Sequence, residues 1–520
     1  MSSTFSRPLK DFLTPVTAAK AGVIEIRPDL NSFTSQIINS LEYDSRRIKE
    51  GSLYFALPGL HVDGHSFISD AIKRGAAAVV YQNDLPEYRD GIIYIKVKDS
   101  RFAMSPVADA FYDSPSRRMK IIGVTGTEGK STTVYLIYQL LKLAGKKTGF
   151  ISTVMQGDGI TEKCTVEHQT TPEAVTIHRL MAEMYLNGAD YAVLESSSHG
   201  LSKKTNRLGD VAFDVGVMTN VTHEHLEFHG SWEQYRYDKA ELFRSLNSFG
   251  VVNADDPSAA YFVAASKHGT YTFSTKGAEA DLYLKNIISE SGGNQYDAVI
   301  RSSGETLSIR DELPGAFNAG NVFAALLVVS NLLSIEIKAL VSFVPKLKPV
   351  RGRMTAIRKG QPFEVVVDYA HTPSSFQTIF PSLRERMNSS GGRLISLFGS
   401  AGERDTKKRP QQGEIAARYS DIVFLADEDP RGEVPMTILE EIAAGCEKIP
   451  GMKRNETLFL IPGRPEAIRK AFSLAKKGDM VILLGKGHEN SIIYEKETMP
   501  YDEIGEAEKA LAEMGYKDKH

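Results

Sequence analysis

The chain has 520 residues, of which 42% are hydrophobic and 24% are charged, and its formal net charge is −3. That length exceeds what one hydrophobic core usually supports and suggests about three domains. The composition is typical of a globular protein and excludes a largely disordered chain. The small net charge argues against a surface that binds nucleic acid or another polyanion.

The cysteines and the apolar runs bear on the compartment. Cys164 and Cys446 lie far apart without a metal-like spacing, so they indicate neither a disulfide framework nor a thiolate zinc site. Residues 1–15 contain no apolar core segment, and no run of about 18 apolar residues occurs anywhere. We therefore expect a cytoplasmic protein with no membrane partner, and a monomer as the default state.

The first part of the chain, residues 1–118, has the pattern of a small α/β domain. Residues 52–57 and 76–81 read as strands, and residues 66–74 between them read as a helix. The turn formers at residues 113–116 predict a linker to the next domain.

Residues 119–349 are expected to form a second domain. Apolar strands alternate with helices at 120–125, 148–153, 191–195 and 213–219, which predicts a parallel sheet. Residues 270–313 carry short period-two runs between Gly and Ser turns, as in an antiparallel insert, and a helix is expected over 318–333.

Residues 350–520 repeat the α/β pattern and are expected to form a third, Rossmann-like domain. Its strands are predicted at 364–368, 393–398, 421–425, 457–461 and 479–484. Ligands of such sheets gather at the carboxyl ends of the strands, where most strands of this chain run into polar clusters.

Residues 126–132 follow an apolar strand and precede a helical pattern, as phosphate-binding loops do. Glycines let backbone N–H groups converge on phosphate oxygens, Lys130 supplies a charge for the outer phosphates, and Ser131 or Thr132 offers a hydroxyl to magnesium. The general expression G-x-x-x-x-G-K-[ST] is not strictly met, because Val124 stands where its first glycine belongs. We predict a variant phosphate loop that binds a nucleoside triphosphate.

Two polar clusters follow the next strands of the second domain. Glu195 ends one strand beside three serines, where its carboxylate either holds magnesium or caps the following segment. Residues 219–230 contain three histidines and two glutamates. His223 and His225 lack the i, i+4 spacing of a helical zinc site, so we favour magnesium over zinc. Further on, Lys239 lies in a helical pattern that by itself indicates a surface lysine.

Taken in order, these motifs resemble the Mur ligases. The central-domain matches are Thr125–Thr132, Thr170-Thr171-Pro172, Glu195–His199, Thr219–Gly230, Lys239 and Gly315–Asn321. The third-domain matches, Gly352–Met354, Asp368–Pro373 and Gly485–Glu489, resemble the branch called MurE, which adds the third residue of the peptidoglycan stem peptide. The resemblance covers nearly the whole chain.

The resemblance implies an ATP-dependent ligase that adds a free diamino acid to UDP-N-acetylmuramoyl-L-alanyl-D-glutamate during peptidoglycan synthesis. A carboxylate of the D-glutamate would attack the γ-phosphate to give an acyl phosphate, which the amine of the incoming amino acid then displaces. Magnesium and Lys130 would offset the repulsion between the carboxylate and the triphosphate.

The same resemblance implies roles for individual residues. The catalytic set is Lys130, Glu195, His225, Lys239 and Arg353. The magnesium ligands are Ser131, Glu195, His225 and Lys239, the last carbamylated by carbon dioxide so that its ammonium becomes an anion. The ATP contacts are Thr125, Gly126, Thr127, Glu128, Gly129, Lys130, Ser131, Thr132, Asn318, Asn321 and Asp368, with helix capping as the alternative role of the two asparagines.

The two substrates are assigned to residues in the same way. The UDP-sugar peptide matches Ser45, Thr170, Thr171, Ser197 and Arg207, and this chain is two residues longer than the family pattern between His199 and Arg207. The amino-acid pocket matches Arg404, Asp429, Arg431, Gly485 and Glu489. Arg431 favours a distal carboxylate, as in meso-diaminopimelate, whereas Asp429 replaces a usual asparagine and favours a substrate that ends in an amine. We therefore favour lysine or ornithine, with meso-diaminopimelate as the alternative.

Three other functions are compatible with a phosphate loop. A folylpolyglutamate synthetase shares the loop and the lysine, but residues 44–46 and 485–489 argue against it. A P-loop kinase or motor does not account for the later motifs. A non-catalytic nucleotide-sugar-binding relative would have lost catalytic positions, whereas Lys130, Glu195, His225 and Lys239 are present.

Overall fold

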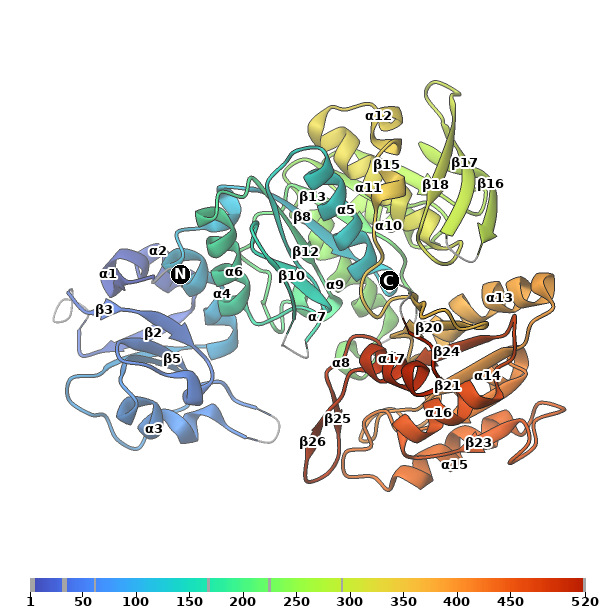
Figure 1. The fold of residues 1–520 in the computed structure, drawn as a ribbon. Helices are drawn as coiled ribbons and strands as arrows, with labels where there is room; N and C mark the ends of the chain where they lie inside the picture. Colours follow the sequence, from blue (N-terminus) through green and yellow to red (C-terminus); the bar gives the residue numbers. More distant parts are fainter. Residues whose placement is uncertain are drawn as a thin grey trace. The chain divides into compact units, whose positions relative to one another are not determined.

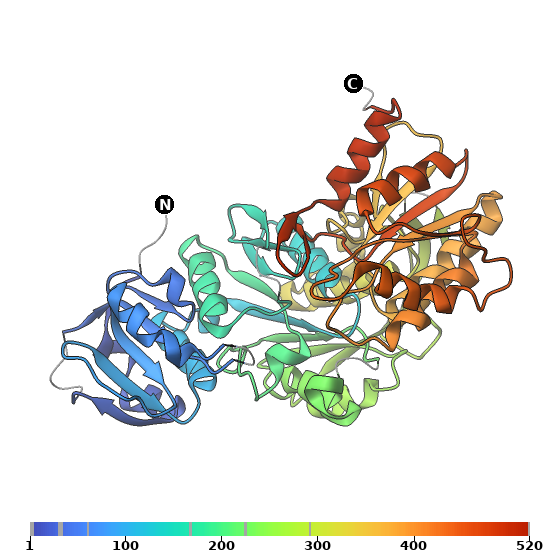
Figure 2. The ribbon, with the colours of Figure 1, turned by 90° about the horizontal axis from the view of Figure 1, so that it is seen from below.

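The computed structural model describes residues 5–29, 35–59, 62–165, 169–222, 226–290 and 293–517. The chain divides into two compact units, drawn as ribbons in Figures 1 and 2. The first comprises Met1–Ser274, Ala278–Asp281 and Phe323–Leu340, and the second comprises Thr275–Gly277, Leu282–Val322 and Val341–His520. No helix in the described ranges combines the length and the apolar character needed to cross a bilayer.

The first unit begins with a small sheet in the order β2-β7-β6-β5-β4, drawn in blue in Figure 2. Its strands from β4 to β7 are parallel, and β2 pairs antiparallel with β7 at the edge. The strands are β2 (Val23–Arg27), β4 (Ser40–Glu42), β5 (Ser52–Phe55), β6 (Ala76–Tyr81) and β7 (Ile93–Val97), and β1 (Arg7–Pro8) pairs separately with β3 (Ile37–Ile38). The helices are α1 (Leu9–Phe12), α2 (Pro15–Lys20), α3 (Ile68–Lys73) and α4 (Ser100–Phe111).

The helix expected over 66–74 consists of two parts, a 3-10 turn at Gly64–Phe67 and then α3. Asp63 starts the turn, because its carboxylate accepts the N–H of His65 at 2.9 Å. The longer helix α4 starts in a similar way, since the Asp99 carboxylate accepts the N–H groups of Arg101 and Phe102.

The larger sheet of the first unit runs in the order β11-β10-β9-β12-β8-β13-β14-β15. It is parallel from β9 to β15, which confirms the expected parallel sheet, and β10 and β11 add an antiparallel edge. The strands are β8 (Lys120–Thr125), β9 (Thr148–Ile151), β10 (Met155–Gly157), β11 (Glu162–Cys164), β12 (Tyr191–Glu195), β13 (Val215–Met218), β14 (Phe249–Asn253) and β15 (Thr270–Ser274). The helices are α5 (Lys130–Leu143), α6 (Ala174–Leu186), α7 (Ser198–Leu201), α8 (Leu226–His229), α9 (Trp232–Arg244) and α10 (Ala259–Ala265).

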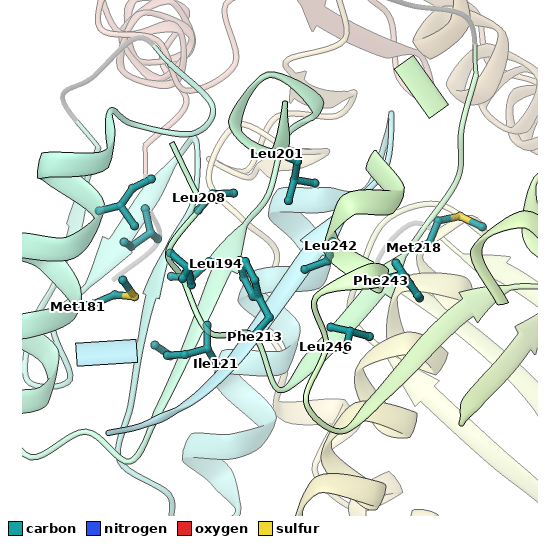
Figure 3. Packing of buried hydrophobic residues seen from close by; sticks show 14 of the residues in the cluster. Ile121, Met181, Leu194, Leu201, Leu208, Phe213, Met218, Leu242, Phe243 and Leu246 are labelled. Atoms are coloured by element: carbon teal, nitrogen blue, oxygen red, sulfur yellow. The ribbon is translucent and has the colours of Figure 1, made fainter. Parts of the chain in front are cut away.

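The core on one face of this sheet brings α9 close to β8. Figure 3 shows three members of one buried apolar cluster: Leu194 of β12, Leu242 of α9, and Phe213, which precedes β13. Gly123 makes this approach possible, because a Cβ at that position would lie 2.6 Å from Leu242 Cδ1. The packing matters for the site, since α9 carries Lys239.

The second unit contains an antiparallel meander and a doubly wound sheet. The meander is β16 (Leu282–Glu290), β17 (Gly293–Ile300) and β18 (Thr306–Asp311), as expected from the period-two runs. The helix α11 (Asn318–Leu333) begins in this unit and continues into the first, where α12 (Ile337–Val341) follows it to the boundary.

The doubly wound sheet has the order β19-β20-β24-β21-β22-β23 and is parallel except for the edge strand β19. One apolar cluster packs α13, α14 and α15 on one face, and a second packs α16 and α17 on the other (Figure 1). This arrangement confirms the Rossmann-like fold expected from the sequence. Its strands are β19 (Thr355–Ile357), β20 (Glu364–Asp368), β21 (Leu394–Phe398), β22 (Ile422–Leu425), β23 (Leu458–Leu460) and β24 (Met480–Leu484), and a separate hairpin pairs β25 (Ser491–Ile493) with β26 (Thr498–Pro500). The helices are α13 (Pro373–Ser390), α14 (Lys408–Tyr419), α15 (Pro435–Cys446), α16 (Arg464–Leu474) and α17 (Glu503–Glu513).

Candidate functional site

The predicted phosphate loop connects β8 to α5 in the first unit. Two of its glycines have positive φ, 152° at Gly126 and 82° at Gly129. A Cβ on Gly126 would lie 1.9 Å from Thr219 Oγ1, so no other residue fits there without a shift. The loop therefore packs its backbone directly against the segment that follows β13.

Hydrogen bonds fix the front of this loop. The N–H of Thr127 donates to the carbonyl of Asn220 at 2.8 Å, and the N–H of Glu128 donates to the Asn220 side chain at 2.9 Å. The Thr127 hydroxyl lies 2.9 Å from the Tyr235 hydroxyl and accepts the N–H of Thr222 at 2.9 Å. Because these two loop N–H groups are engaged, the first N–H groups of α5 are the ones oriented for an anion.

Two side-chain oxygens that could bind a metal ion meet where α5 and β12 approach each other. The Ser131 hydroxyl donates to Glu195 Oε2 at 2.9 Å, and the same carboxylate oxygen accepts the N–H of Thr153 at 2.8 Å. Only 4% of Ser131 and 3% of Glu195 is exposed. The Thr125 hydroxyl is also buried and has no hydrogen-bond partner in the described part of the chain. These are hard oxygen donors, the kind that magnesium prefers.

Two lysines donate to carbonyls of the same loop. Lys130 Nζ donates to the Thr127 carbonyl at 2.7 Å, and Lys239 Nζ donates to the Gly126 carbonyl at 2.6 Å. Lys239 is 2% exposed and lies over the Tyr235 ring, 4.6 Å from its centre. The helical pattern alone indicated a surface lysine, and that interpretation is wrong because α9 presses this face against β8.

A buried polar chain that sequence reasoning missed joins α9 to the serines after β12. His229 Nδ1 lies 2.8 Å from Asp238 Oδ2, and His229 Nε2 lies 3.1 Å from the Ser198 hydroxyl. Burial raises the pKa of Asp238, but hydrogen bonds from His229 and Gln234 outweigh it and leave that pKa below its usual value.

The predicted metal ligand His225, together with His223 and Glu224, lies outside the described residues. In the ranges that the structure does describe, no three His, Cys, Asp or Glu side chains converge as a metal-binding group. Of the expected magnesium ligands, Ser131, Glu195 and Lys239 lie within the described residues.

Residues predicted for the UDP-sugar peptide gather next to Glu195. Thr171 donates its hydroxyl to the Glu195 carbonyl at 3.0 Å and accepts the N–H of Ser197 at 3.0 Å. Arg207 Nη1 donates to the Thr171 carbonyl at 2.9 Å, and Thr170 lies half-buried immediately before it. Ser45 instead begins a 3-10 turn after β4, where Asp44 accepts the N–H of Arg46.

In the second unit, Asp368 ends β20 and fixes the turn beside Arg353. Its carboxylate accepts the N–H of Met354 at 2.8 Å and that of Ala370 at 2.7 Å. Burial raises the pKa of Asp368, and the Arg353 charge opposes this rise. The Arg353 guanidinium lies 4.7 Å from the centre of the Tyr369 ring, and its Nε is buried without a hydrogen-bond partner among the described residues.

Asn318 and Asn321 occupy the first turn of α11. Asn318 Nδ2 donates to the Pro314 carbonyl at 2.8 Å, and Asn321 Nδ2 donates to Asn318 Oδ1 at 2.8 Å. Asn318 thus donates to a carbonyl before the helix. This is a different contact from an N-cap, in which a side-chain oxygen accepts a helix N–H.

Two of the residues predicted for the amino-acid pocket, Asp429 and Glu489, contact Lys486, whose importance sequence reasoning overlooked although it stands within the Gly485–Glu489 motif. Lys486 is fully buried, and its Nζ donates to Asp429 Oδ1 at 2.9 Å and to Glu489 Oε2 at 2.6 Å. The charge of Asp429 is therefore already offset within the protein. Arg404 is exposed in the loop after β21.

Two charged side chains beside this pair retain buried atoms with no hydrogen-bond partner among the described residues, Glu428 Oε2 and Arg431 Nε. Gly485 has φ 98°, and a Cβ there would lie 3.0 Å from Glu428 Oε2. Arg431 has φ 54°, and its N–H donates to the Ile493 carbonyl at 2.9 Å. The Glu428 carboxylate next to Gly485 and the Arg431 guanidinium two residues after Asp429 suit a ligand that carries both an ammonium and a carboxylate.

Comparison with known proteins identifies matches to three family descriptions. The Mur ligase family catalytic domain matches residues 37–112, the Mur ligase middle domain matches 124–329, and the Mur ligase glutamate ligase domain matches 352–487.

Curated relatives and a solved structure match over most of the chain. A UDP-N-acetylmuramyl-tripeptide synthetase of Treponema denticola is 52% identical over 91% of this chain and 94% of its own. A UDP-N-acetylmuramoyl-L-alanyl-D-glutamate–2,6-diaminopimelate ligase of Clostridium tetani is 35% identical over 90% of this chain and 93% of its own. A solved structure of a ligase with that second name has 27% identity and a TM-score of 0.63, and the match covers 98% of this chain and 100% of that one.

Proposed function

Because the chain belongs to the Mur ligase family, as its motifs led us to expect, we propose how its described residues carry out the family's ATP-dependent ligation. The activity is that of a tripeptide synthetase in peptidoglycan synthesis. Our proposal adds the acceptor, UDP-N-acetylmuramoyl-L-alanyl-D-glutamate, the acyl-phosphate route, the residues that act, and the amino acid that is added.

The observation that carries the proposal is the buried contact between Ser131 and Glu195 at the start of α5. A hydroxyl and a carboxylate oxygen 2.9 Å apart, beside the first N–H groups of a helix, fit a magnesium ion that accompanies a triphosphate. When bound, such an ion neutralises the phosphate charge and polarises the γ-phosphate. We assign Ser131 and Glu195 to hold it and Lys130 to the outer phosphates.

Carbamylation of Lys239 is part of the proposal. A lysine carbamate keeps one N–H, so the modified side chain could still donate to the Gly126 carbonyl, 2.6 Å from Nζ. Its carboxylate end would supply a fixed negative charge next to the phosphate loop, where an ammonium would repel the metal. Carbamylation is therefore compatible with the observed position of Lys239.

The acceptor carboxylate must approach the γ-phosphate in line, which requires the acceptor to be held still. We assign Thr171, Ser197 and Arg207 to this task, because they are hydrogen-bonded directly next to Glu195. Arg353 and Asp368 are proposed for the ATP site on the family pattern alone.

For the amino acid we favour lysine or ornithine. Lys486 already offsets Asp429, so we assign the terminal ammonium to Glu428, whose buried Oε2 has no hydrogen-bond partner among the described residues. Arg431 Nε supports the second candidate, because a buried guanidinium N–H that has no partner among the described residues also suits the distal carboxylate of meso-diaminopimelate.

The test is phosphate release by the purified protein with ATP, magnesium and UDP-N-acetylmuramoyl-L-alanyl-D-glutamate, with lysine, ornithine and meso-diaminopimelate compared in parallel. Release that depends on lysine or ornithine supports the proposal, and a Glu428→Gln variant should then raise the KM for that amino acid. Release with meso-diaminopimelate alone would assign Arg431 the selecting role. No release with any of them, from folded protein that binds ATP, would contradict the proposed acceptor.

A further inference from the structure

One buried carboxylate in the first unit is shared by two arginines that come from different parts of the chain. Glu173 precedes α6, and its Oε1 accepts Arg101 Nη1 at 2.5 Å and Arg207 Nη2 at 3.0 Å. The side-chain exposures are 6% for Glu173, 12% for Arg207 and 29% for Arg101. Arg101 belongs to α4 of the small first sheet, whereas Arg207 belongs to the loop after α7.

Two polar atoms of this cluster lack partners within the part of the chain that the structure describes. Glu173 Oε2 and Arg207 Nε are both buried and form no hydrogen bond with the described residues. Two guanidinium groups face one carboxylate, so the three side chains keep one net positive charge. That charge lies beside Thr171, to whose carbonyl Arg207 Nη1 donates at 2.9 Å.

The helix that supplies Arg101 also braces the loop that carries Arg207. Asn206 adopts the left-handed conformation with φ 51°, and its Nδ2 donates to the Phe102 carbonyl at 3.0 Å. The N–H of Asp210 donates to the Ser105 hydroxyl at 3.2 Å. The position of Arg207 therefore depends on α4 through the backbone as well as through Glu173.

We propose that Arg101 is a positioning residue for the nucleotide-sugar peptide. It shares the Glu173 carboxylate with Arg207, so Glu173 does not fully neutralise the charge of Arg207. This inference rests on the proposed function, in which Arg207 holds the acceptor, and adds that it does so through an anionic group of that substrate. Without Arg101, both oxygens of Glu173 would be free to form a bidentate pair with Arg207, which is the strongest geometry for these two groups. The substrate anion, a phosphate or a carboxylate, would then meet a neutral pair.

The experiment measures binding by calorimetry, so that its result does not depend on turnover. The probes are UDP-N-acetylmuramoyl-L-alanyl-D-glutamate and UDP. The Arg101→Ala variant should bind the first at least about tenfold more weakly, with an unchanged KM for ATP and an unchanged melting temperature. If UDP binding weakens equally, the anion is the diphosphate; if it does not, the anion lies in the sugar-peptide portion.

A second substitution separates the charge argument from simple bracing. In the double variant Arg101→Ala, Glu173→Gln, the residue opposite Arg207 is neutral, so affinity should return to within about threefold of wild type. The matched control is Lys20→Ala, which removes an exposed ion pair to Asp210 on the same loop, at 3.7 Å, and should leave affinity unchanged.

Unchanged affinity in Arg101→Ala would overturn the inference, and so would a double variant that binds as weakly as the single one. Weakening in Lys20→Ala equal to that in Arg101→Ala would also overturn it, because any loss of bracing would then suffice. Failure of the proposed function has a different signature, since the wild-type protein itself would bind the nucleotide-sugar peptide no better than UDP.

Discussion

The buried ion pair between Arg464 and Glu503 should control both the stability of the doubly wound sheet in the second unit and the proposed amino-acid pocket. Both side chains are fully buried, and Arg464 donates to the two carboxylate oxygens at 2.9 and 2.5 Å. The Tyr501 hydroxyl donates to the same carboxylate at 2.5 Å. Burial alone would lower the pKa of Arg464, yet the Glu503 charge raises it, so Arg464 keeps its positive charge.

The perturbation is Glu503→Gln, which keeps the shape but leaves a buried guanidinium without a counter-charge. Removing one partner of a buried pair typically costs about 3–5 kcal/mol of unfolding free energy. A double variant, Arg464→Met with Glu503→Leu, removes both charges and should be more stable than Glu503→Gln, even though the Asp427 and Leu484 carbonyls lose their donor. The contrast between the two isolates the uncompensated charge from the loss of packing.

The assay is hydrogen exchange of the full-length protein, because a chain with several domains need not unfold in one step. A loss of 3–5 kcal/mol corresponds to roughly 100- to 4,000-fold faster exchange of the β22 and β24 amides through opening of the domain. Arg464 also donates to the carbonyls of Asp427 and Leu484, next to Glu428 and Gly485, so the KM for the amino acid should rise while that for ATP stays constant. Equal exchange in Glu503→Gln and wild type would refute the reasoning.

Three further predictions follow from single side chains. Lys239→Ala should abolish turnover with little change in melting temperature, and near-normal kcat would contradict the proposed role of its carbamate. Lys486→Met leaves Asp429 buried without its ammonium, so the KM for the amino acid should rise at least about tenfold, whereas a change confined to the KM for ATP would assign Lys486 elsewhere. Burial raises the pKa of Asp427 to about 6, so the unfolding free energy of wild type relative to Asp427→Asn should fall as the pH rises from 3.8 to about 6. The check is the melting temperature of both proteins across this pH range. A wild-type melting temperature that rises with pH relative to that of Asp427→Asn would contradict the prediction.

The parallel sheets could be predicted because each buried strand is a short apolar run that ends in glycine or polar residues. The strand expected over 191–195 has the same bounds as β12. The strand expected over 213–219 corresponds to β13, which is shorter and covers only 215–218. The helix expected over 66–74 begins with a 3-10 turn. Ends of elements depend on capping contacts such as that of Asp63, which an apolar pattern does not report.

The candidate site was less accessible to sequence reasoning, because its contacts join residues far apart in the chain. The Lys239 pattern alone indicated a solvated lysine, and its burial follows from Gly123, which lets α9 approach β8. Lys486 was overlooked because no local pattern shows whether the lysine of this glycine-rich turn points inward. The pairing of Arg101 with Glu173 spans 72 residues and joins α4 to the turn before α6, so no local pattern could reveal it.

The cations of the site share one property that bears on how ligands bind. Lys130 and Arg207 each donate to a backbone carbonyl, at 2.7 and 2.9 Å, so their side chains are ordered by the protein itself. Lys486 is held in the same way by two carboxylates. Ordering a long charged side chain costs about 1.5–2 kcal/mol, and here folding has already met that cost. Under the proposed function, an anionic substrate exchanges one hydrogen bond for another at groups already in place. Its affinity should then respond more to the charge balance around each cation than to the number of cations.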